Sequence, residues 1–530
     1  MAHVTVASNA VIGKLYGPNK AAPDPAVVTY VNNLLSFKVD GAGFGGLGWD
    51  GRSSFFDVTN NTFPAGFAHL VSTELANIGH KVGVVKKPLP SPLGPENPIV
   101  DEFGNDNPDY DYQLKALRQV EKYGAGVIQV ATGGGKSKIA KLIMARYRRM
   151  TLFLTTRGIL MYQMDDQLKA IGLNTGQIGD GEMRVTKGVN LGMVQTLVSA
   201  LQVPKLSDER IAVITALHKS RKRDQGKNPT SDAEITRIAQ QRYDEKVKKR
   251  NQIIKILEMV EVVIGEEAHE AGGNSYYEIL RHCKNAAIRV ALTATPFMRT
   301  SAEDNMRLMA AFGPTLIQIS EKMLIDRGIL AKPYFIFRDV APHPKLYKTS
   351  PFERAYTLGY LENEAMYEQA LADALKGKEL GMPTLSLILR KKHGEEIERR
   401  YKAAGLRVEF LKGENDQAER KEQLRRLAAG EIDVCIGTTI LDVGVDCPAI
   451  GLLQLLGGGK AEVALRQRIG RALRRKKGKL NASLIIDYTC NKNGSLSEHA
   501  RQRRLIIEST PGFVEGIVQD VENFDWAMFA

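Results

Sequence analysis

Short apolar runs alternate with helix-like segments along most of this chain. The runs Val127–Val130 and Leu152–Thr155 are apolar and bounded by polar or turn residues, which is typical of buried strands. The segments Leu114–Tyr123 and Lys138–Arg149 beside them have helical periodicity instead. Repeated units of this kind predict an α/β fold in which crossover helices join the strands of a parallel sheet.

A second series of the same kind begins after the proline-containing stretch Lys332–Pro344. Its strand-like runs are Leu385–Leu389, Val408–Leu411, Val434–Gly437, Leu452–Leu456 and Leu484–Asp487. The pattern therefore predicts two tandem parallel-sheet domains, over residues 108–330 and 331–492. Residues 493–530 are expected to form a C-terminal tail.

The first hundred residues have a different pattern of apolar and turn-forming residues. Ser53–Val58 is strand-like and Ala65–Ile78 has the pattern of an amphipathic helix, so residues 1–100 are predicted to form a small α+β domain. The proline-rich stretch Lys86–Pro98 cannot lie inside a helix and predicts an extended linker. Few contacts are expected to cross such a linker.

A highly charged insertion, at about residues 205–258, interrupts the first α/β domain with a pattern that predicts helices. Basic residues cluster within it at Lys219–Arg223 and Lys246–Arg250. Such clusters either contact the phosphates of a nucleic acid or form the solvated face of a charged helix. Both interpretations stay open at this point.

Composition narrows the class of partner. The 530 residues carry 73 lysines and arginines against 60 acids, a net charge of +13 that favours polyanions. Four scattered cysteines without C-x-x-C spacing argue against a zinc module or a disulfide framework. No apolar run approaches the ~18–20 residues of a membrane-spanning helix, and no secretory signal opens the chain. We therefore expect a cytoplasmic protein with no membrane partner.

The strongest local motif is VATGGGKSKIAKLI, at Val130–Ile143. An apolar run, a glycine turn, Lys-Ser and a helix follow one another in it. Glycines let backbone N–H groups cradle phosphates, the lysine reaches the β/γ-phosphates, and the serine hydroxyl ligates Mg²⁺. The motif predicts a nucleotide phosphate site formed by Thr132, Gly133, Gly134, Gly135, Lys136 and Ser137.

Two carboxylates end a strand-like run in VEVVIGEEAHEA, at Val260–Ala271. In a phosphate-loop ATPase, an acid at this place holds the metal ion and the next acid orients the attacking water. Glu266 and Glu267 fit these two roles, with Ser137 as a further ligand of Mg²⁺.

Taken in order, five motifs resemble those of the superfamily 2 helicases. They are ATGGGKS (Ala131–Ser137), EEAH (Glu266–His269), TATP (Thr293–Pro296), TTILDVGVD (Thr438–Asp446) and QRIGRALR (Gln467–Arg474). The resemblance implies two RecA-like domains, ATP bound in the cleft between them, and nucleic acid lying across both.

The resemblance also implies roles for single residues. Gln113 would read the adenine, and Thr293 and Thr295 would couple hydrolysis to domain movement. Gly444 and Asp446 would contact the nucleotide from the second domain.

Gln467, Arg471 and Arg474 match the arginine-finger motif of the same family. Guanidinium groups at these positions would neutralise the charge that develops on the transferred phosphoryl group.

Two stretches, Tyr112–Ser137 and the shorter Gly46–Val71, are similar to the branch that includes XPB and the phage UvsW recombination helicases. This likeness implies an ATP-dependent DNA helicase or translocase acting on branched DNA, such as forks and recombination or repair intermediates. It also implies that the N-terminal domain is an accessory DNA-binding domain. A phage-encoded protein acting in the host cytoplasm is compatible with it.

The chain departs from the family at Glu266, where the family has aspartate. The extra methylene lies in a site where Mg²⁺ demands near-octahedral geometry at ~2.0–2.1 Å, so it bears on the rate of hydrolysis. Two alternatives therefore stand beside the DNA helicase. One is an RNA helicase of the same fold, and the other is a nucleotide-gated DNA-binding protein with weak turnover.

Overall fold

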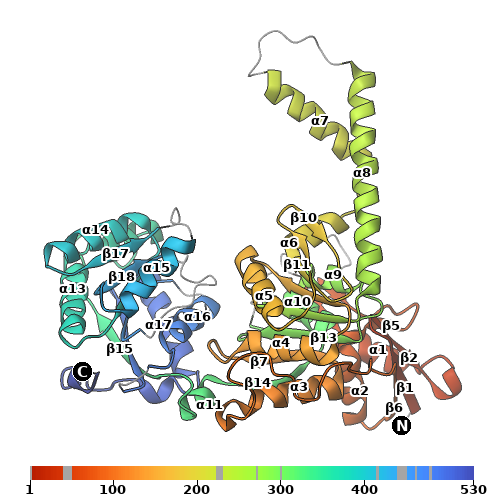
Figure 1. Cartoon of the computed structure of the whole chain (residues 1–530), viewed down its shortest axis with the longest axis horizontal. Coiled ribbons are helices and arrows are strands. Elements are labelled where there is room, and N and C mark those ends of the chain that lie inside the picture. The colour runs from red at the N-terminus through yellow and green to blue at the C-terminus, as the bar shows by residue number, and fades with distance from the viewer. Residues whose placement is uncertain are drawn as a thin grey trace. The chain divides into compact units, whose positions relative to one another are not determined.

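The computed structural model describes residues 3–39, 50–221, 231–269, 272–298, 301–412, 417–438, 450–459, 462–476 and 480–529. They form two compact units, drawn in Figure 1. The first comprises residues 1–129 and 136–318, and the second comprises residues 130–135 and 319–530. No helix in the described part of the chain is long and apolar enough to cross a membrane.

The first unit begins with a small α+β domain. Its main sheet has the strand order β5-β2-β1-β6, with β1 antiparallel to β2 and parallel to β6. The elements are β1 (His3–Ser8), β2 (Ile12–Tyr16), α1 (Pro25–Leu34), β3 (Ser36–Lys38), β4 (Arg52–Ser54), β5 (Thr62–Pro64), α2 (Ala68–Asn77) and β6 (Lys81–Lys86). The predicted helix at Ala65–Ile78 is thus confirmed as a short 3₁₀ turn followed by α2.

The core of this N-terminal domain extends into the neighbouring α/β domain. Alternate residues of β1, Val4 and Val6, are buried, as expected for a strand with one face on a core. Ala310 of the α/β domain belongs to the same apolar cluster. The rings of Phe55 and Tyr277 also meet edge-on across this boundary, with their centroids 6.0 Å apart. The two domains are therefore packed into one unit.

The α/β domain of the first unit is built on an eight-stranded sheet of order β10-β9-β11-β8-β12-β13-β7-β14. Its strands are β7 (Ala125–Val130), β8 (Thr151–Thr155), β9 (Thr175–Gly179), β10 (Glu182–Arg184), β11 (Val189–Met193), β12 (Val262–Glu266), β13 (Ile288–Thr293) and β14 (Thr315–Ile319). Its helices are α3 (Asp111–Tyr123), α4 (Lys136–Tyr147), α5 (Gly158–Ala170), α6 (Val194–Leu201), α9 (Gly272–Leu280) and α10 (Ala302–Phe312). β7, β13 and β12 pair in parallel, so their carboxyl ends meet at one edge of the sheet.

The charged insertion forms a helical arm that projects from this domain (Figure 1). It consists of α7 (Leu206–Arg221) and α8 (Asp232–Met259), so the helices predicted for it are confirmed. The base of α8 is anchored in the core of the domain through Ile253 and Leu257. Farther out, Val213 of α7 and Ala239 of α8 are buried where the two helices pack on each other.

The proline-rich stretch is extended, as the sequence predicts, but it is docked along α4 and the turn after it. The Gly94 N–H donates to the Arg146 carbonyl at 2.8 Å, and Arg149 Nε donates to the Ser91 carbonyl at 2.9 Å. A Cβ added at Gly94 would lie 2.0 Å from the Ala145 carbonyl oxygen, so the two backbones touch. The expectation that few contacts cross this stretch is wrong, because its backbone groups are bonded to the α/β domain.

The second unit contains a six-stranded parallel sheet of order β15-β20-β19-β16-β18-β17. Its strands are β15 (Lys332–Asp339), β16 (Thr384–Leu387), β17 (Val408–Leu411), β18 (Val434–Gly437), β19 (Leu452–Leu455) and β20 (Ala482–Thr489). Its helices are α11 (Glu321–Asp326), α12 (Phe352–Tyr356), α13 (Glu364–Glu379), α14 (Lys391–Ala403), α15 (Gln417–Ala428), α16 (Glu462–Ala472) and α17 (Gly494–Glu508). Each of the five predicted strand-like runs is a strand here.

The end of the chain is a folded part of this second unit, although a tail was expected there. Arg503 of α17 forms a buried ion pair with Asp487 of β20, with Nε and Oδ2 2.9 Å apart. Trp526 and Phe529 belong to the apolar core of the unit. Residues 480–529 therefore complete the second α/β domain.

Candidate nucleotide site

The glycine turn after β7 has the backbone that a phosphate-binding loop needs. Gly133 and Gly135 have φ angles of +87° and +82°, which side chains rarely allow, and Thr132 precedes them. At Gly134 an added Cβ would lie 2.6 Å from Val130 Cγ1, so that position also excludes a side chain. The geometry of the turn therefore accounts for the three glycines of ATGGGKS.

Lys136 and Ser137 form the first turn of α4, directly after the glycines. The N-terminal turn of a helix presents unpaired N–H groups and the positive end of the helix dipole, which favours anions. Lys136 Nζ forms a half-buried ion pair with Glu267 Oε1, across 131 residues of sequence. The structure thus brings together the predicted phosphate-binding lysine and the predicted water-orienting acid.

The two acids occupy different backbone positions at the end of β12. Glu266 is the last residue of the strand and is buried, and its carbonyl oxygen accepts a hydrogen bond from Tyr276 Oη at 2.8 Å. Glu267 follows with a φ angle of +43°, a left-handed conformation that is uncommon outside glycine. Backbone strain of this kind clusters at functional sites.

The loop after β12 is linked to the end of β13 through a histidine. His269 Nδ1 lies 2.7 Å from Thr293 Oγ1, and both residues are buried. The Thr295 N–H donates to the same hydroxyl at 3.2 Å, and His269 Nδ1 lies 3.4 Å from Glu267 Oε2. One chain of polar contacts therefore runs from Glu267, the acid predicted to orient water, to the TATP motif.

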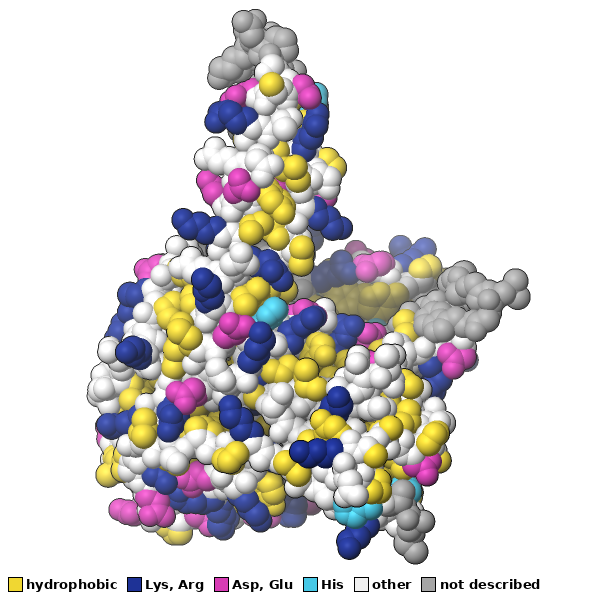
Figure 2. Space-filling model, turned by 90° about the vertical axis from the view of Figure 1, so that its right-hand side faces the viewer, with side chains coloured by type: hydrophobic (Ala, Val, Ile, Leu, Met, Phe, Trp, Pro, Cys, Tyr) yellow, Lys and Arg dark blue, Asp and Glu magenta, His cyan; other side chains and the backbone are white. Residues whose placement is uncertain are grey.

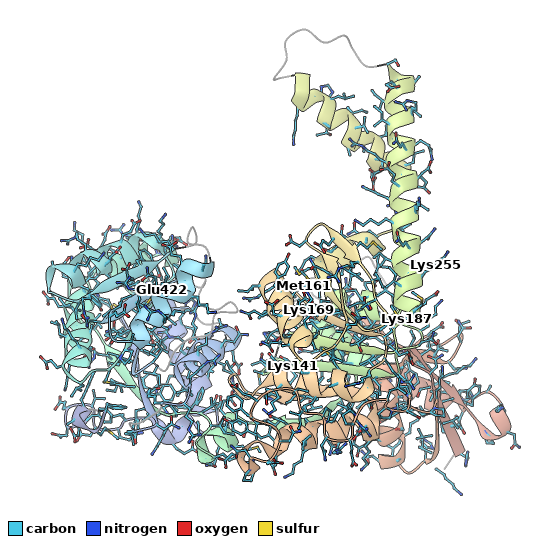
Figure 3. The ribbon with its side chains drawn as sticks, viewed as in Figure 1. Lys141, Met161, Lys169, Lys187, Lys255 and Glu422 are labelled. Atoms are coloured by element: carbon cyan, nitrogen blue, oxygen red, sulfur yellow. The ribbon has the colours of Figure 1, made fainter. Side chains whose placement is uncertain are left out.

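The segment that precedes Gln113 is also tied to α4. Lys138 Nζ donates to Asp101 Oδ1 at 3.0 Å and to the Gly104 carbonyl at 2.6 Å. Burial lowers the pKa of Lys141, one turn further along α4, and the Asp101 carboxylate opposes that shift (Figure 3). Gln113 itself is buried in the first turn of α3.

In the second unit, Gln467 and Arg471 lie on α16, and Arg474 follows that helix. Arg474 forms an isolated β-bridge with Leu330. Within the same unit, a Cβ added at Gly470 would lie 2.6 Å from Thr132 Cβ, so the motif with the arginines approaches the glycine turn closely. Gly444 and Asp446 lie outside the described residues.

Sequence reasoning did not single out His269 or Asp101. For His269 the available signal was its position two residues after a pair of acids. Asp101 has no sequence signal, because its contact with Lys138 depends on how the proline-rich stretch folds back along α4.

The oxygen donors at this edge suit a hard cation. Ser137, Glu266 and Glu267 offer hydroxyl and carboxylate oxygens, the ligands that Mg²⁺ prefers. No group of three histidines, cysteines or acids in the described ranges could hold a metal by itself. Mg²⁺ at such sites is bound by one or two protein oxygens together with substrate phosphates, and this donor set fits that pattern.

Two family models match the chain. The model described as the res subunit of type III restriction enzymes matches residues 108–298, and the model of the helicase conserved C-terminal domain matches residues 369–476. Together they cover more than half of the chain.

Curated relatives match over shorter stretches. A protein of Sulfolobus islandicus filamentous virus that carries a helicase name is 26% identical over 283 residues, which are 50% of this chain and 50% of that protein. UvrABC system protein B of Kosmotoga olearia is 33% identical over 132 residues, 24% of this chain and 20% of that protein. The chain thus spans half or less of the length of these relatives.

Among solved structures, UvsW of phage T4 covers 97% of this chain and 98% of its own, at 16% identity and a TM-score of 0.42. The helicase MrfA, solved bound to DNA, covers 79% of this chain and 53% of its own, at 14% identity and a TM-score of 0.50. The likeness to MrfA shows a shared fold.

Proposed function

We propose that this chain, which belongs to the superfamily 2 helicases and hydrolyses ATP, is a DNA helicase or translocase that remodels branched DNA. The observation that carries the proposal is the group Lys136, Glu267 and Thr293. They lie at the carboxyl-terminal edge of adjacent parallel strands, joined by the Lys136–Glu267 ion pair and the His269–Thr293 contact.

ATP is bound in this proposal by the glycine turn and by the helix that follows it. Backbone N–H groups of residues 132–135 hold the phosphates, Lys136 faces the β/γ-phosphates, and Glu267 orients the attacking water. Ser137 and Glu266 would hold Mg²⁺, and that ion would supply stabilisation of the charge on the leaving phosphates. Gln113 reads the adenine.

The second domain contributes the remaining groups. Arg471 and Arg474 act as the arginine fingers, beside Gln467, while Gly444 and Asp446 contact the nucleotide. Because these groups come from a second domain, hydrolysis depends on closure of the two domains, and closure is what moves the motor along a strand.

Two observations support DNA rather than RNA as the substrate. The stretch Tyr112–Ser137 is similar to DNA helicases of the XPB and UvsW branch. The structural neighbour MrfA was solved bound to DNA. Backbone contacts dominate the binding of such motors, so little sequence specificity is expected.

Branch recognition requires an element besides the two motor domains, and the chain offers two candidates. The N-terminal domain is the accessory DNA-binding domain that the resemblance implies. The helical arm is the more basic of the two: residues Lys205–Met259 contain fourteen lysines and arginines against eight acids, +6 of the total +13. Figure 2 shows blue side chains on either side of this arm, and Lys255 projects from its lower part in Figure 3.

The first experiment is an ATPase assay across nucleic acids at one fixed salt concentration, since salt changes phosphate contacts strongly. Single strands, duplexes, forks and four-way junctions are compared, in DNA and in RNA. Stimulation highest with forked or four-way DNA supports the proposal. Stronger stimulation by RNA would favour an RNA helicase, and hardly any turnover with tight DNA binding would favour a nucleotide-gated binding protein.

A matched pair of charge-reversal variants tests whether the helical arm or the N-terminal domain recognises branched DNA. On the arm, Arg242, Lys248 and Lys249 are exposed and form no ion pair with other described residues. On the N-terminal domain, Lys20, Lys38 and Lys81 are also exposed. Changing each trio to glutamate alters the net charge equally, so only location differs.

We expect the arm variant to lose preference for branched over single-stranded DNA while its basal ATPase is unchanged. Loss of that preference in the N-terminal variant alone would assign branch reading to the N-terminal domain. If both variants prefer branched over single-stranded DNA as strongly as the unchanged protein does, neither surface recognises the branch.

A further inference from the structure

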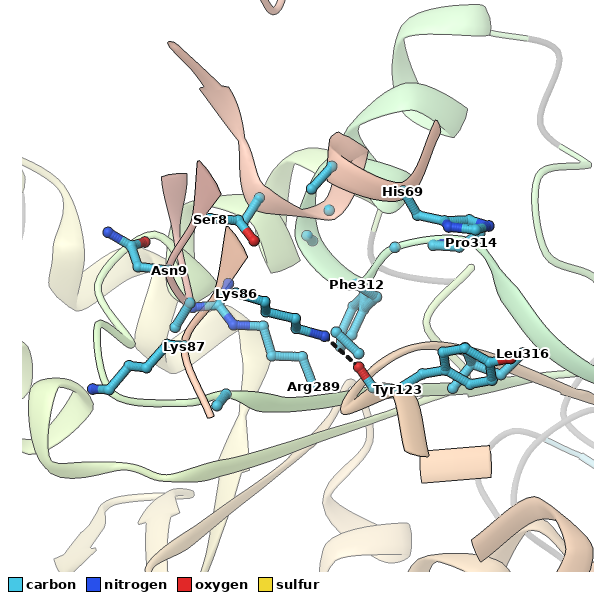
Figure 4. A pocket seen from close by; sticks show the side chains of 18 of the residues that line it. Ser8, Asn9, His69, Lys86, Lys87, Tyr123, Arg289, Phe312, Pro314 and Leu316 are labelled. Carbon is cyan, nitrogen blue, oxygen red and sulfur yellow. Dashed lines mark hydrogen bonds between the residues drawn. The ribbon is translucent and has the colours of Figure 1, made fainter. Parts of the chain in front are cut away.

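A cavity of about 440 Å³ lies where the N-terminal domain meets the first α/β domain (Figure 4). The N-terminal domain contributes residues of β1, the turn before α2, and the end of β6, including His69, Lys86 and Lys87. The α/β domain contributes residues such as Tyr123 and Arg289. Volumes of this size are typical of pockets for small molecules.

The lining is basic and contains no acid. Its basic side chains are Lys86, Lys87 and Arg289, with His69 beside them, and no aspartate or glutamate lies among the described residues that line it. A concave site with one sign of charge and low-dielectric walls concentrates ions of the opposite sign.

Arg289 is the deepest of these charges. Its side chain is 5% exposed, and its Nε and Nη2 donate to the carbonyls of Ala286 and Cys283 at 2.9 and 2.8 Å. Both partners are neutral, and burial lowers its pKa to about 10. A buried charge without an ionic partner is costly, which gives an anion entering the cavity a strong attraction to this group.

Lys86 points toward the same space. Its Nζ donates to the Tyr123 carbonyl at 2.5 Å, again a neutral partner, and burial lowers its pKa. Figure 4 shows this bond and the Arg289 side chain beside it. Two cations from different domains thus face one cavity, each bonded only to backbone carbonyls among the described residues.

The rest of the wall is apolar and partly aromatic. Tyr123, Pro314 and Leu316 line one part of the cavity, while Phe312, which also borders it, has no exposed surface. A ligand that fits this lining has a compact anionic group at one end and a ring-sized apolar body at the other.

We propose that this cavity is a second ligand site, separate from the ATP site, that binds a phosphate monoester of nucleotide size. The phosphate lies between Arg289, Lys86 and Lys87, and the base lies against the apolar wall. Such a phosphate has two sources, a free nucleoside monophosphate or the 5′-terminal phosphate of a nucleic-acid strand. Because both domains line the cavity, the ligand bridges them and stabilises their junction.

The test measures binding to the full-length chain by calorimetry and by the shift of its unfolding temperature. The probes are inorganic phosphate, thymidine monophosphate, and a short single strand with either a 5′-phosphate or a 5′-hydroxyl, each with excess ADP and Mg²⁺ present. Binding of the monophosphate identifies the free nucleotide as the source. Tighter binding of the phosphorylated than of the hydroxyl strand identifies the strand end.

Lys86→Met and Lys87→Ala should each weaken phosphate-dependent binding on the order of tenfold, as expected for loss of a charge-assisted contact. Lys81→Ala, an exposed lysine on the same strand as Lys86 but outside the cavity, is the matched control and should bind normally. Lys136→Ala should also leave this binding intact. Binding lost in Lys136→Ala and retained in Lys86→Met would place the phosphate in the ATP site and overturn the proposal, as would no binding of any probe.

Discussion

His269 Nδ1 lies 2.7 Å from Thr293 Oγ1, and this contact links the loop that carries Glu267, the proposed water-orienting acid, to the TATP motif at the end of β13. The Thr295 N–H donates to the same hydroxyl, so the Thr293 side chain contacts both His269 and the backbone of Thr295. A change at the γ-phosphate end of the site can thus reach the TATP segment through one buried contact.

Thr293→Val keeps the shape of the side chain and removes that hydroxyl. We expect ATP turnover to fall by less than about tenfold, since one buried hydrogen bond contributes about 1 kcal/mol, while strand separation falls much further. The measurement is the number of base pairs unwound per ATP hydrolysed. A double-mutant cycle with His269→Ala tests the link: two independent residues would give additive losses.

Lys136→Ala should abolish ATP hydrolysis and weaken nucleotide binding, because it removes the fixed positive charge facing the phosphates. Glu267→Gln is its matched comparison: it also breaks the Lys136 ion pair, but should retain nucleotide binding and lose turnover by at least about 10²-fold. Fluorescent-nucleotide binding and phosphate release measured side by side distinguish these results. Substantial DNA-stimulated turnover in pure Lys136→Ala protein would contradict the assignment of the site.

Arg474→Ala, and to a similar degree Arg471→Ala, should leave ATP binding nearly intact while turnover falls on the order of 10³-fold, because fingers act on the transition state. Lys421→Ala, an exposed basic residue on α15, serves as a control for a general loss of positive charge. The result that contradicts the role is weakened binding with unchanged turnover at saturating ATP.

Glu266 is buried at the end of β12, and its longer side chain replaces the usual aspartate. Glu266→Ala should abolish magnesium-dependent turnover, and Glu266→Asp should retain or raise it, if the carboxylate is the metal ligand. Turnover titrated against Mg²⁺ at fixed ATP gives the apparent affinity for the metal in each variant. A normal titration curve for Glu266→Ala would remove this residue from the metal site.

His393 of α14 makes the stability of the second domain depend on pH. Its ring is almost fully buried against Tyr367, neither ring nitrogen has a hydrogen-bond partner in the described ranges, and burial lowers its pKa to about 4. The folded state keeps the ring neutral, whereas the unfolded chain protonates it near its ordinary pKa of 6.5.

Stability from this group is therefore complete above about pH 6.5 and is lost as the pH falls toward 4, by about 3 kcal/mol in total. His393→Phe should flatten that part of the curve of unfolding free energy against pH. Parallel curves for the unchanged protein and His393→Phe would show that His393 does not titrate in this range.

Much of the architecture was predictable because it follows from short-range patterns. Val408–Leu411 and Val434–Gly437 are strands with the bounds read from their apolar runs. The glycine turn was predictable too, since the φ angles of Gly133 and Gly135 are ones that glycine tolerates best.

What could not be predicted depends on contacts between distant segments. β15 carries Pro333, which disfavours a strand reading, yet it pairs with β20 along its whole length at an edge of the sheet, where proline is tolerated. Arg503 gave no signal as a core residue, because only the fold shows Asp487 beside it. The proline-rich stretch likewise has the composition of a free linker, and its docking depends on backbone groups that sequence patterns do not report.

The length of α8 can be compared with the length of duplex DNA that the helical arm could contact. Its 28 residues rise about 1.5 Å each, so the helix is about 42 Å long. That equals roughly twelve base pairs of B-form duplex at about 3.4 Å per step, slightly more than one helical turn. The last turns of α8, from Ile253 on, are packed in the core of the domain, so only the part before them can extend along DNA. A motor with that projecting part beside the duplex would leave a nuclease footprint longer on one side by somewhat less than a turn, and charge reversal on it would shorten the footprint on that side alone.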